Sequence, residues 1–198
     1  DSKVISNTFA DAKLKPGIHI LSVGRFAPHK RIEKMIEVVS IYKELISPDV
    51  ILDLVGSSSS KWYLESLELL VSNLKLEDSV KFHTDIDDSQ LANFYRDSDA
   101  YLCLSEHEGF CVPLVEAQCA GLPIVAKDFA AIPETVGRAG IVLDKEAEIV
   151  DVVAAIDVII NNEQLRNEIV TNAKANMELH NVDKEAKRAV DWLIEGSS

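Results

Sequence analysis

The chain has 198 residues, of which 47% are apolar and 27% charged. This is the composition of a globular protein and excludes a disordered chain. Twenty lysines and arginines stand against 33 aspartates and glutamates, so the net charge is −13. A surface that binds nucleic acid or an anionic membrane needs clustered cations, so this balance argues against both partners. The sequence contains no apolar run near the ~20 residues of a membrane-spanning helix. Its first residues lack a basic region followed by an apolar one, so no signal peptide is expected among them.

The first two thirds of the chain alternate between short apolar runs and amphipathic segments. The apolar runs predict six strands, at residues 18–23, 50–55, 80–82, 100–104, 123–126 and 140–143. Apolar residues at helical spacing predict helices between these strands, within residues 32–46, around 67–74, around 91–95 and at 113–120. Strands that are apolar throughout, separated by amphipathic helices, indicate a parallel sheet covered on both faces.

From residue 146 onward the pattern is helical only, with apolar faces in 149–160, 165–173 and 182–193. We therefore predict a single α/β domain, a doubly wound, Rossmann-like parallel sheet with a helical C-terminal tail. Its parts are a lead-in segment (1–16), the α/β core (17–144) and the tail (145–198). In such sheets ligands bind beyond the carboxyl ends of the strands, so the loops that follow strands carry the functional information.

The loop after the first predicted strand carries three cations, Arg25, Lys30 and Arg31, between Gly24 and the next helix. Pro28 suits the start of that helix. A helix amino end presents unpaired N–H groups, so cations beside it strengthen its preference for an anion. The alternative is a solvated basic turn, but such clustering in an acidic chain favours a binding site. The loop is neither a Walker A loop nor a G-x-G-x-x-G fingerprint, which argues against a nucleoside triphosphatase or a Rossmann dehydrogenase.

The loop after the fourth predicted strand leads from Glu108 to Glu116. Gly109 lets the backbone approach a ligand, and Pro113 places Glu116 about one turn into the next helix. A carboxylate accepts two hydrogen bonds and a vicinal diol offers two donors, so the pair suits sugar hydroxyls. The backbone N–H groups of residues 110–112 can face a phosphate. Alternatively, Glu116 only complements the helix dipole and Glu108 is solvated, and these residues alone leave both interpretations open.

Together, the two loops resemble those of a known enzyme family. Residues 108–123 resemble the E-x7-E signature of glycosyltransferase family 4, a large family of retaining enzymes. Residues 24–30 look like its diphosphate-binding segment, and residues 99–105 and 132–134 are similar to its usual neighbouring segments. The resemblance covers about residues 17–180 and is specific, because several motifs occur in the same order and spacing.

The resemblance implies the GT-B architecture, in which two Rossmann-like domains face each other across a cleft, and this chain looks like the C-terminal, donor-binding half. It implies that Arg25 and Lys30 hold the diphosphate of a nucleotide sugar and that Glu108 binds hydroxyls of the donor sugar; these three are the expected catalytic residues. Glu116 would bind the ribose. The full set of donor-binding residues that the match implies is Gly24, Ile86, Gly109, Phe110, Cys111, Val112 and Glu116.

The same resemblance implies retaining transfer of a hexosyl group from a nucleoside-diphosphate sugar to a glycan or lipid-linked acceptor, in polysaccharide biosynthesis. The acceptor would bind through a missing N-terminal domain, so the isolated fragment is expected to be inactive. No metal or other cofactor is expected, because Arg25, Lys30 and helix amino ends can offset the charge of the leaving diphosphate. The expected location is the cytoplasm, with the full-length enzyme at the inner face of the membrane.

Two alternatives stay open at this point: half of a nucleotide-sugar epimerase, and a non-catalytic α/β module that binds an effector or partner. The sequence departs from the family pattern at Cys111 and Thr84, which stand where glycine is common, and at Ala130-Ala131, which replace a frequent pair of glycines. These departures bear on the identity of the donor sugar. We leave open whether His83 lines the pocket for the base.

Other polar or aromatic residues have simpler explanations. Asp85-Ile86-Asp87 spells a D-x-D metal motif, but Asp87 and Gln90 are expected to form a helix capping box. His19, within a strand, is expected to be a hydrogen-bonded core histidine, and Trp62 a packing residue. The cysteines are too few for a disulfide framework and are expected to be small buried thiols in a reducing compartment: Cys103, Cys111 and Cys119.

Overall fold

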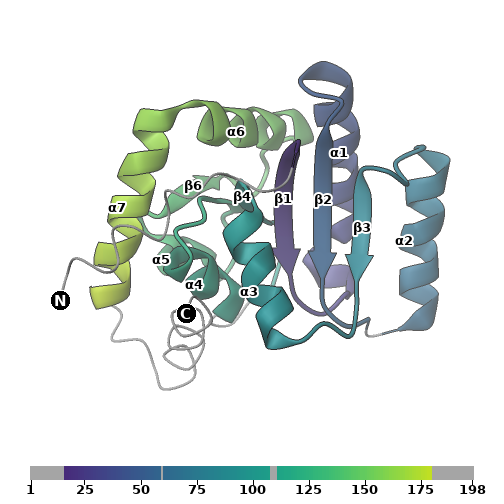
Figure 1. Ribbon diagram of the computed structural model, residues 1–198, viewed down its shortest axis with the longest axis horizontal. Coiled ribbons are helices and arrows are strands. Elements are labelled where there is room, and N and C mark those ends of the chain that lie inside the picture. The colour runs from purple at the N-terminus through teal and green to yellow at the C-terminus, as the bar shows by residue number, and fades with distance from the viewer. Residues whose placement is uncertain (1–15, 59, 108–110, 180–198) are drawn as a thin grey trace.

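The computed structural model describes residues 16–58, 60–107 and 111–179. Within them, six strands form one parallel sheet in the order β3-β2-β1-β4-β5-β6 (Figure 1). The strands are β1 (Ile18–Val23), β2 (Val50–Val55), β3 (Val80–His83), β4 (Ala100–Cys103), β5 (Ile124–Lys127) and β6 (Gly140–Leu143). This confirms the predicted doubly wound sheet, with strand bounds within two residues of those expected.

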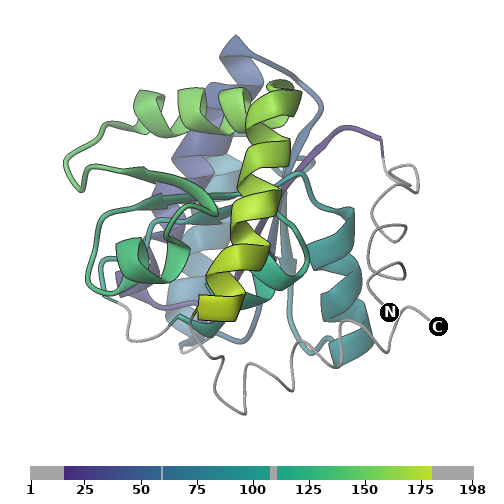
Figure 2. The same cartoon turned by 90° about the vertical axis from the view of Figure 1, so that its left-hand side faces the viewer.

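Helices cover both faces of the sheet, each over its own apolar cluster. One face carries α1 (Ile32–Leu45), α2 (Lys61–Asn73) and α6 (Ile149–Asn161). The opposite face carries α3 (Asp88–Asp97), α4 (Val112–Cys119) and α5 (Ile132–Val136). The last described helix, α7 (Glu163–Leu179), runs past the β6 edge of the sheet and packs on α4 (Figure 2).

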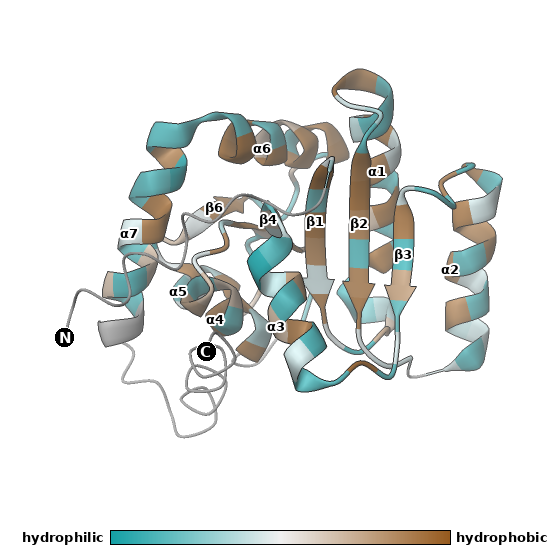
Figure 3. Cartoon of the chain, in the orientation of Figure 1, coloured by the Kyte–Doolittle hydropathy of each residue, from teal (hydrophilic) through white to brown (hydrophobic). Residues whose placement is uncertain are grey.

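The core follows directly from the apolar patterning of the strands, which stand out as hydrophobic in Figure 3. Helix α1 buries the side chains that recur at helical spacing, including Ile36 and Val39 at 0% exposure. Helix α6 is apolar around most of its circumference, and Val152, Ile156 and Ile159 are likewise fully buried. The first helix of the predicted tail is therefore part of the layer that covers the sheet.

Some local expectations need correction or lie outside the described residues. Helix α5 was not predicted, because five residues are too few to show helical periodicity. Trp62, expected to be a packing residue, is 74% exposed on α2, so that expectation is wrong. The third predicted face of the tail, residues 182–193, lies outside the described residues.

Candidate functional site

The strand order reverses direction between β1 and β4, which is the switch point where doubly wound sheets bind ligands. The two strands pair only through Ile20 with Ala100 and Leu21 with Tyr101. Two residues beyond Leu21, the backbone of Val23 bonds instead to the hydroxyl of Tyr101, which accepts from its N–H (3.3 Å) and donates to its carbonyl (3.1 Å). The loops that follow β1 and β4 therefore leave the sheet side by side at the switch point.

Glycines at the ends of β1 and β2 allow neighbouring groups to lie close to the backbone. Gly24 has a φ of +149°, and a Cβ on this residue would lie 3.4 Å from the Nζ of Lys30. A Cβ on Gly56, at the end of β2, would lie 2.1 Å from the carbonyl oxygen of Gly24, so only glycine fits there. The half-buried Lys30 thus reaches back over the end of β1, whereas Arg25 is exposed.

The approach to α1 differs from the expectation. Pro28 does not begin α1 but a single turn of 3-10 helix, Pro28–Lys30. Arg31 then adopts a left-handed conformation with a φ of +53°, and α1 begins at Ile32. Pro28 does not begin α1 because the left-handed backbone at Arg31 changes the direction of the chain. This change separates the 3-10 turn from α1 and sets the cationic loop apart from the amino end of α1.

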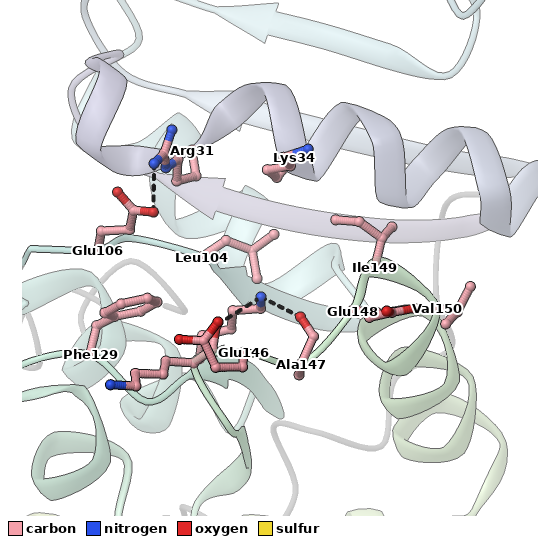
Figure 4. A pocket seen from close by; sticks show the side chains of 12 residues that line it. Arg31, Lys34, Leu104, Glu106, Phe129, Glu146, Ala147, Glu148, Ile149 and Val150 are labelled. Atoms are coloured by element: carbon pink, nitrogen blue, oxygen red, sulfur yellow. Dashed lines mark hydrogen bonds and ion pairs between the residues drawn. The ribbon is translucent and has the colours of Figure 1, made fainter.

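A contact between the loops after β1 and β4 was not predicted from the sequence. The backbone N–H of Glu106 donates to the carbonyl of His29 (2.9 Å). The carboxylate of Glu106 pairs with the guanidinium of Arg31, with 2.7 Å between Nη2 and Oε1 (Figure 4). Both side chains are about 40% exposed, so the ion pair itself adds little stability. Its effect is to join the two loops across the switch point.

The loop after β4 enters α4 through a strained residue. Cys111 caps α4 with a φ of +48° and is 8% exposed, which explains in physical terms why glycine suits this position. Val112 is the first residue of α4 and is 37% exposed. Glu116 lies one turn into the helix, as Pro113 predicted. Three predicted ligands lie outside the described residues: Glu108, Gly109 and Phe110.

Glu116 is half-buried and hydrogen-bonded to a tyrosine of α3. The hydroxyl of Tyr95 donates to its Oε2 at 2.6 Å. Burial raises the pKa of Glu116, the hydrogen bond from Tyr95 lowers it, and the nearby carboxylate of Asp88 raises it again; the net pKa lies above the ordinary value. The ring of Tyr95 stacks on Tyr101, with 6.1 Å between centroids and 14° between planes. Neither tyrosine was assigned to the site from the sequence.

The loop after β3 contributes Ile86, which is half-buried against the same apolar cluster as Tyr95 and Cys111. The structure therefore places Cys111 and Glu116 beside Tyr95, and Ile86 against the same apolar cluster. Within the D-x-D segment, Asp87 caps α3. Its carboxylate accepts from the backbone N–H of Gln90, and the side-chain oxygen of Gln90 accepts from the backbone N–H of Asp87, which confirms the predicted capping box.

Next to this loop lies a buried cluster that the sequence did not reveal as a unit. Asp53 is 4% exposed, with 2.9 Å between its Oδ2 and Nδ1 of His19 and 2.7 Å between its Oδ1 and Nε2 of His83. Burial raises the pKa of Asp53, but the hydrogen bonds and positive charge of the two histidines outweigh it and lower the pKa to about 2. His19 is a hydrogen-bonded core residue, as predicted. His83 also packs against Phe94, with ring centroids 4.5 Å apart.

The cysteines of the chain are buried or half-buried, and the described residues form no evident metal site. Cys103 and Cys111 are buried, Cys119 is half-buried, and none of the three forms a disulfide bond in the described structure. Burial raises the pKa of Cys119 to about 12. Among the described residues, no group of three or more histidine, cysteine, aspartate or glutamate side chains is arranged to hold a metal ion. Likewise, none of the described helices is both long and apolar enough to cross a membrane.

A cavity of about 530 Å³ lies between the amino ends of α1 and α6 (Figure 4). Its wall includes the Arg31–Glu106 pair, Lys34, Phe129 and the segment 145–150. The ammonium of Lys127 anchors that segment by donating to the carbonyls of Lys145 and Ala147. Of the predicted donor-binding residues that the structure describes, none lines this cavity, and its side chains carry both signs of charge.

Comparison with known proteins identifies the family. Residues 6–176 match the family described as "Glycosyl transferases group 1". The chain is 31% identical over 142 residues to "GDP-mannose:cellobiosyl-diphosphopolyprenol alpha-mannosyltransferase" of Komagataeibacter xylinus, covering 70% of this chain and 35% of that protein. It is 26% identical over 126 residues to "O-antigen chain mannosyltransferase B" of Escherichia coli, covering 64% and 32%. The chain thus spans about a third of these relatives.

Solved structures show the same fold. The lipopolysaccharide glycosyltransferase WaaG matches with a TM-score of 0.75 at 19% identity, covering 91% of this chain and 48% of that chain. The C-terminal domain of the group 1 glycosyl transferase LpcC from Francisella tularensis matches with a TM-score of 0.73 at 23% identity, covering 85% and 89%. The fold is that of a GT-B domain. By its family match over most of its length, the chain belongs to the group 1 glycosyl transferases.

Proposed function

We propose that this chain is the domain that binds the nucleoside-diphosphate sugar in a retaining, family 4 glycosyltransferase. In this proposal Glu108 and Glu116 are the two ends of an E-x7-E motif. The observation that carries it is the arrangement at the switch point: a lysine lies over the glycine that ends β1, and a half-buried glutamate stands one turn into α4. Retention of configuration is inferred from the resemblance of the motif.

The diphosphate of the donor is assigned to the cationic loop. Lys30 lies over Gly24 at the switch point. Arg25 is exposed, so its side chain can extend toward a ligand. Arginine offers a planar fork to phosphate oxygens and lysine a point charge, so together they offset the charge that grows on the leaving diphosphate. The amino end of α4 at Val112 adds its dipole. These groups supply the positive charge in place of a metal ion.

The sugar and ribose are assigned to the α4 side. Glu116, bonded to Tyr95, would accept hydrogen bonds from the ribose, and Ile86, packed against the same apolar cluster, would contact the base. Glu108 would bind the transferred sugar, with Gly109 allowing close approach and the backbone N–H groups of Phe110 and Cys111 near sugar and phosphate. These roles follow from the resemblance and complete the proposed donor site.

The names of the relatives guide the choice of substrates. Two of them are mannosyltransferases, and one name gives GDP-mannose as donor and a diphosphopolyprenol-linked acceptor. We propose transfer of a hexosyl group to a glycan or lipid-linked acceptor in polysaccharide biosynthesis on the cytoplasmic side. The acceptor would bind an N-terminal domain that faces this one, so this domain alone is proposed to bind donor without transferring it.

The test is binding of a nucleotide with and without its phosphates. Isothermal titration should show that GDP, UDP or ADP binds far more tightly than the matching nucleoside, and thermal-shift measurements with GDP-mannose, UDP-glucose and ADP-glucose should identify the donor. Arg25→Ala should weaken the diphosphate about ten- to a hundredfold, the effect of ~1.5–3 kcal/mol for a charged hydrogen bond. Arg96→Ala, which removes an exposed cation paired with Asp97, should have no effect. Equal affinity for nucleoside and diphosphate would overturn the proposal.

A further inference from the structure

We propose that Tyr95 is a positioning residue for Glu116: its hydroxyl fixes one carboxylate oxygen so that the other is held ready for the ribose diol. The inference rests on the proposed function of Glu116 as the ribose ligand. It adds a residue that the E-x7-E motif does not contain and that lies on a different helix, α3, from the motif.

The hydrogen bond between the two side chains is short. The hydroxyl oxygen of Tyr95 lies 2.6 Å from Oε2 of Glu116, within the range of charge-assisted O–H···O⁻ bonds. The carbonyl of Pro113 lies 3.5 Å from the same hydroxyl and is a much poorer acceptor for it. Because a tyrosine hydroxyl has a single proton, that proton is committed to Glu116.

The bond leaves the carboxylate capable of binding a diol. An ionised carboxylate has two oxygens that together accept about four hydrogen bonds, and Tyr95 occupies one of these on Oε2. Glutamate has three side-chain torsions, each with several accessible rotamers. A hydrogen bond from a fixed donor removes that freedom before the ligand arrives, so less ordering remains to be done on binding.

Tyr95 is itself fixed, because it is 1% exposed and its ring stacks on that of Tyr101. The hydroxyl of Tyr101 is held by both backbone polar groups of Val23, the residue before Gly24. A continuous series of buried contacts therefore runs from the end of β1 through two tyrosines to Glu116. It sets the position of the ribose carboxylate relative to the loop that carries Arg25 and Lys30.

The hydroxyl also favours the ionised form of Glu116. The titratable groups that act on this carboxylate or respond to it are Tyr95 and Asp88 on α3, Cys119 on α4 and Tyr101 on β4. Burial and Asp88 raise the pKa of Glu116, and the hydrogen bond from Tyr95 is the influence that lowers it. Without the hydroxyl, the pKa rises further, and a smaller fraction of the carboxylate is ionised at a given pH.

The experiment compares a ribonucleotide with its 2′,3′-dideoxy form in the intact chain. The probe is whichever of GDP, UDP and ADP binds the wild-type chain most tightly, and isothermal titration is repeated between pH 5 and 8. Tyr95→Phe should weaken the ribonucleotide about tenfold and leave the dideoxy nucleotide unchanged. It should also move the loss of ribonucleotide binding at low pH to a higher pH. A merely structural role would weaken both nucleotides equally and leave the pH profile in place.

Tyr42→Phe, on α1, is the matched control, because it also removes the hydroxyl of a buried tyrosine but lies in the apolar cluster on the opposite face of the sheet. It should leave the ratio of the two affinities and the pH profile as in the wild type. Glu116→Asp tests the same contact without altering Tyr95, since the shorter side chain draws the charge away from the hydroxyl; it should lose the preference for ribose. This second variant keeps the inference testable if Tyr95→Phe does not fold.

Two failures are distinguishable. If Glu116→Gln keeps the wild-type preference for the ribonucleotide, or if none of the three nucleotides binds, the assigned role of Glu116 is wrong and the inference is overturned with it. If Glu116→Gln abolishes the preference while Tyr95→Phe and Glu116→Asp retain both the preference and the wild-type pH profile, the assignment of Glu116 holds. Only the positioning role of Tyr95 is then overturned.

Discussion

The hydroxyl of Tyr101 serves as the hydrogen-bond partner of Val23 where β1 and β4 separate. It accepts from the backbone N–H of Val23 at 3.3 Å and donates to its carbonyl at 3.1 Å. A backbone polar group that loses its partner strand inside a protein costs free energy unless another group replaces it. One side chain thus lets the two central strands diverge without leaving these groups unpaired.

Tyr101→Phe should lower the free energy of unfolding by about 1–3 kcal/mol, because it leaves the N–H and the carbonyl of Val23 without this partner. The measurement is urea denaturation followed by circular dichroism. Tyr42→Phe is the control, since the hydroxyl of Tyr42 makes only a 3.4 Å bond to Asp157, a side chain that also accepts from Asn161 at 2.7 Å. Equal losses in the two variants would contradict the role given to Tyr101.

The fold was predictable because its signals are local. Strands buried on both faces appear as short, mainly apolar runs, and α1 and α6 show their buried faces at helical spacing. The two errors in the predicted elements also have local causes. Helix α5 is too short to show periodicity, and α1 does not begin at Pro28 because the turn that begins there ends at the left-handed Arg31. Trp62 illustrates a different limit, because a large aromatic residue at an exposed helix position has no signal that marks it as exposed.

Only the part of the candidate site that lies in the two loop motifs was predictable from the sequence. Tyr95 contacts Glu116 across 21 positions of the sequence and Val23 contacts Tyr101 across 78, so no local pattern reveals either pair. The buried cluster around Asp53 could have been predicted, because Asp53 is a single carboxylate inside an otherwise apolar strand. A buried charge needs partners, and the two histidines at strand positions, His19 and His83, were available for that role.

Ala130 is held in a left-handed conformation with a φ of +51°, whereas its neighbour Ala131 has an ordinary φ of −83°. The left-handed region costs a residue with a Cβ ~1–2 kcal/mol, a cost that glycine avoids. Ala130→Gly should therefore raise the free energy of unfolding by about 0.5–1 kcal/mol even though glycine gains freedom in the unfolded chain. Ala131→Gly should lower it by a similar amount. Thermal melts of both variants make the comparison, and a loss of stability in Ala130→Gly would refute it.

Asp53 makes the stability of the fold depend on pH. Its pKa is about 2 in the folded chain against 3.8 ordinarily, so the ionised form stabilises the fold above about pH 4 and this contribution is lost as the pH falls toward 2. The contribution amounts to roughly 2 kcal/mol. Asp53→Asn should be destabilised by about that amount at pH 6 and should converge with the wild type near pH 2. Urea denaturation at several pH values measures it; curves that stay parallel down to pH 2 would exclude this role of Asp53.

Donor binding should not require a divalent metal. Arg25, Lys30 and the amino end of α4 supply the positive charge in the proposed site, and the carboxylate of Asp87 is already used to cap α3. Affinity for the nucleoside diphosphate should therefore be unchanged after dialysis against a chelator, as measured by isothermal titration. If binding needed added magnesium or manganese, the D-x-D segment at Asp85 and Asp87 would have to be considered as the ligand.

The two glutamates of the proposed motif should act on different parts of the donor. Glu116 is assigned to the ribose, so Glu116→Gln should weaken a free nucleoside diphosphate and the complete sugar nucleotide alike. Glu108 is assigned to the transferred sugar alone, so Glu108→Gln should weaken only the sugar nucleotide. An interaction that is absent from one ligand cannot contribute to the affinity for that ligand. Charged hydrogen bonds of this kind are worth ~1.5–3 kcal/mol, or about ten- to a hundredfold in affinity.

Isothermal titration of both variants with both ligands separates these roles. Glu134→Gln, on the short helix α5, is the control for removing a carboxylate elsewhere on the same face of the sheet, and it should leave all affinities unchanged. In a two-domain enzyme that contains this chain, Glu108→Gln should also slow sugar transfer, because the lost contact involves the group that is transferred. If Glu108→Gln weakens the free diphosphate as much as the sugar nucleotide, then Glu108 binds the diphosphate or supports its loop, and the sugar must be held by other residues.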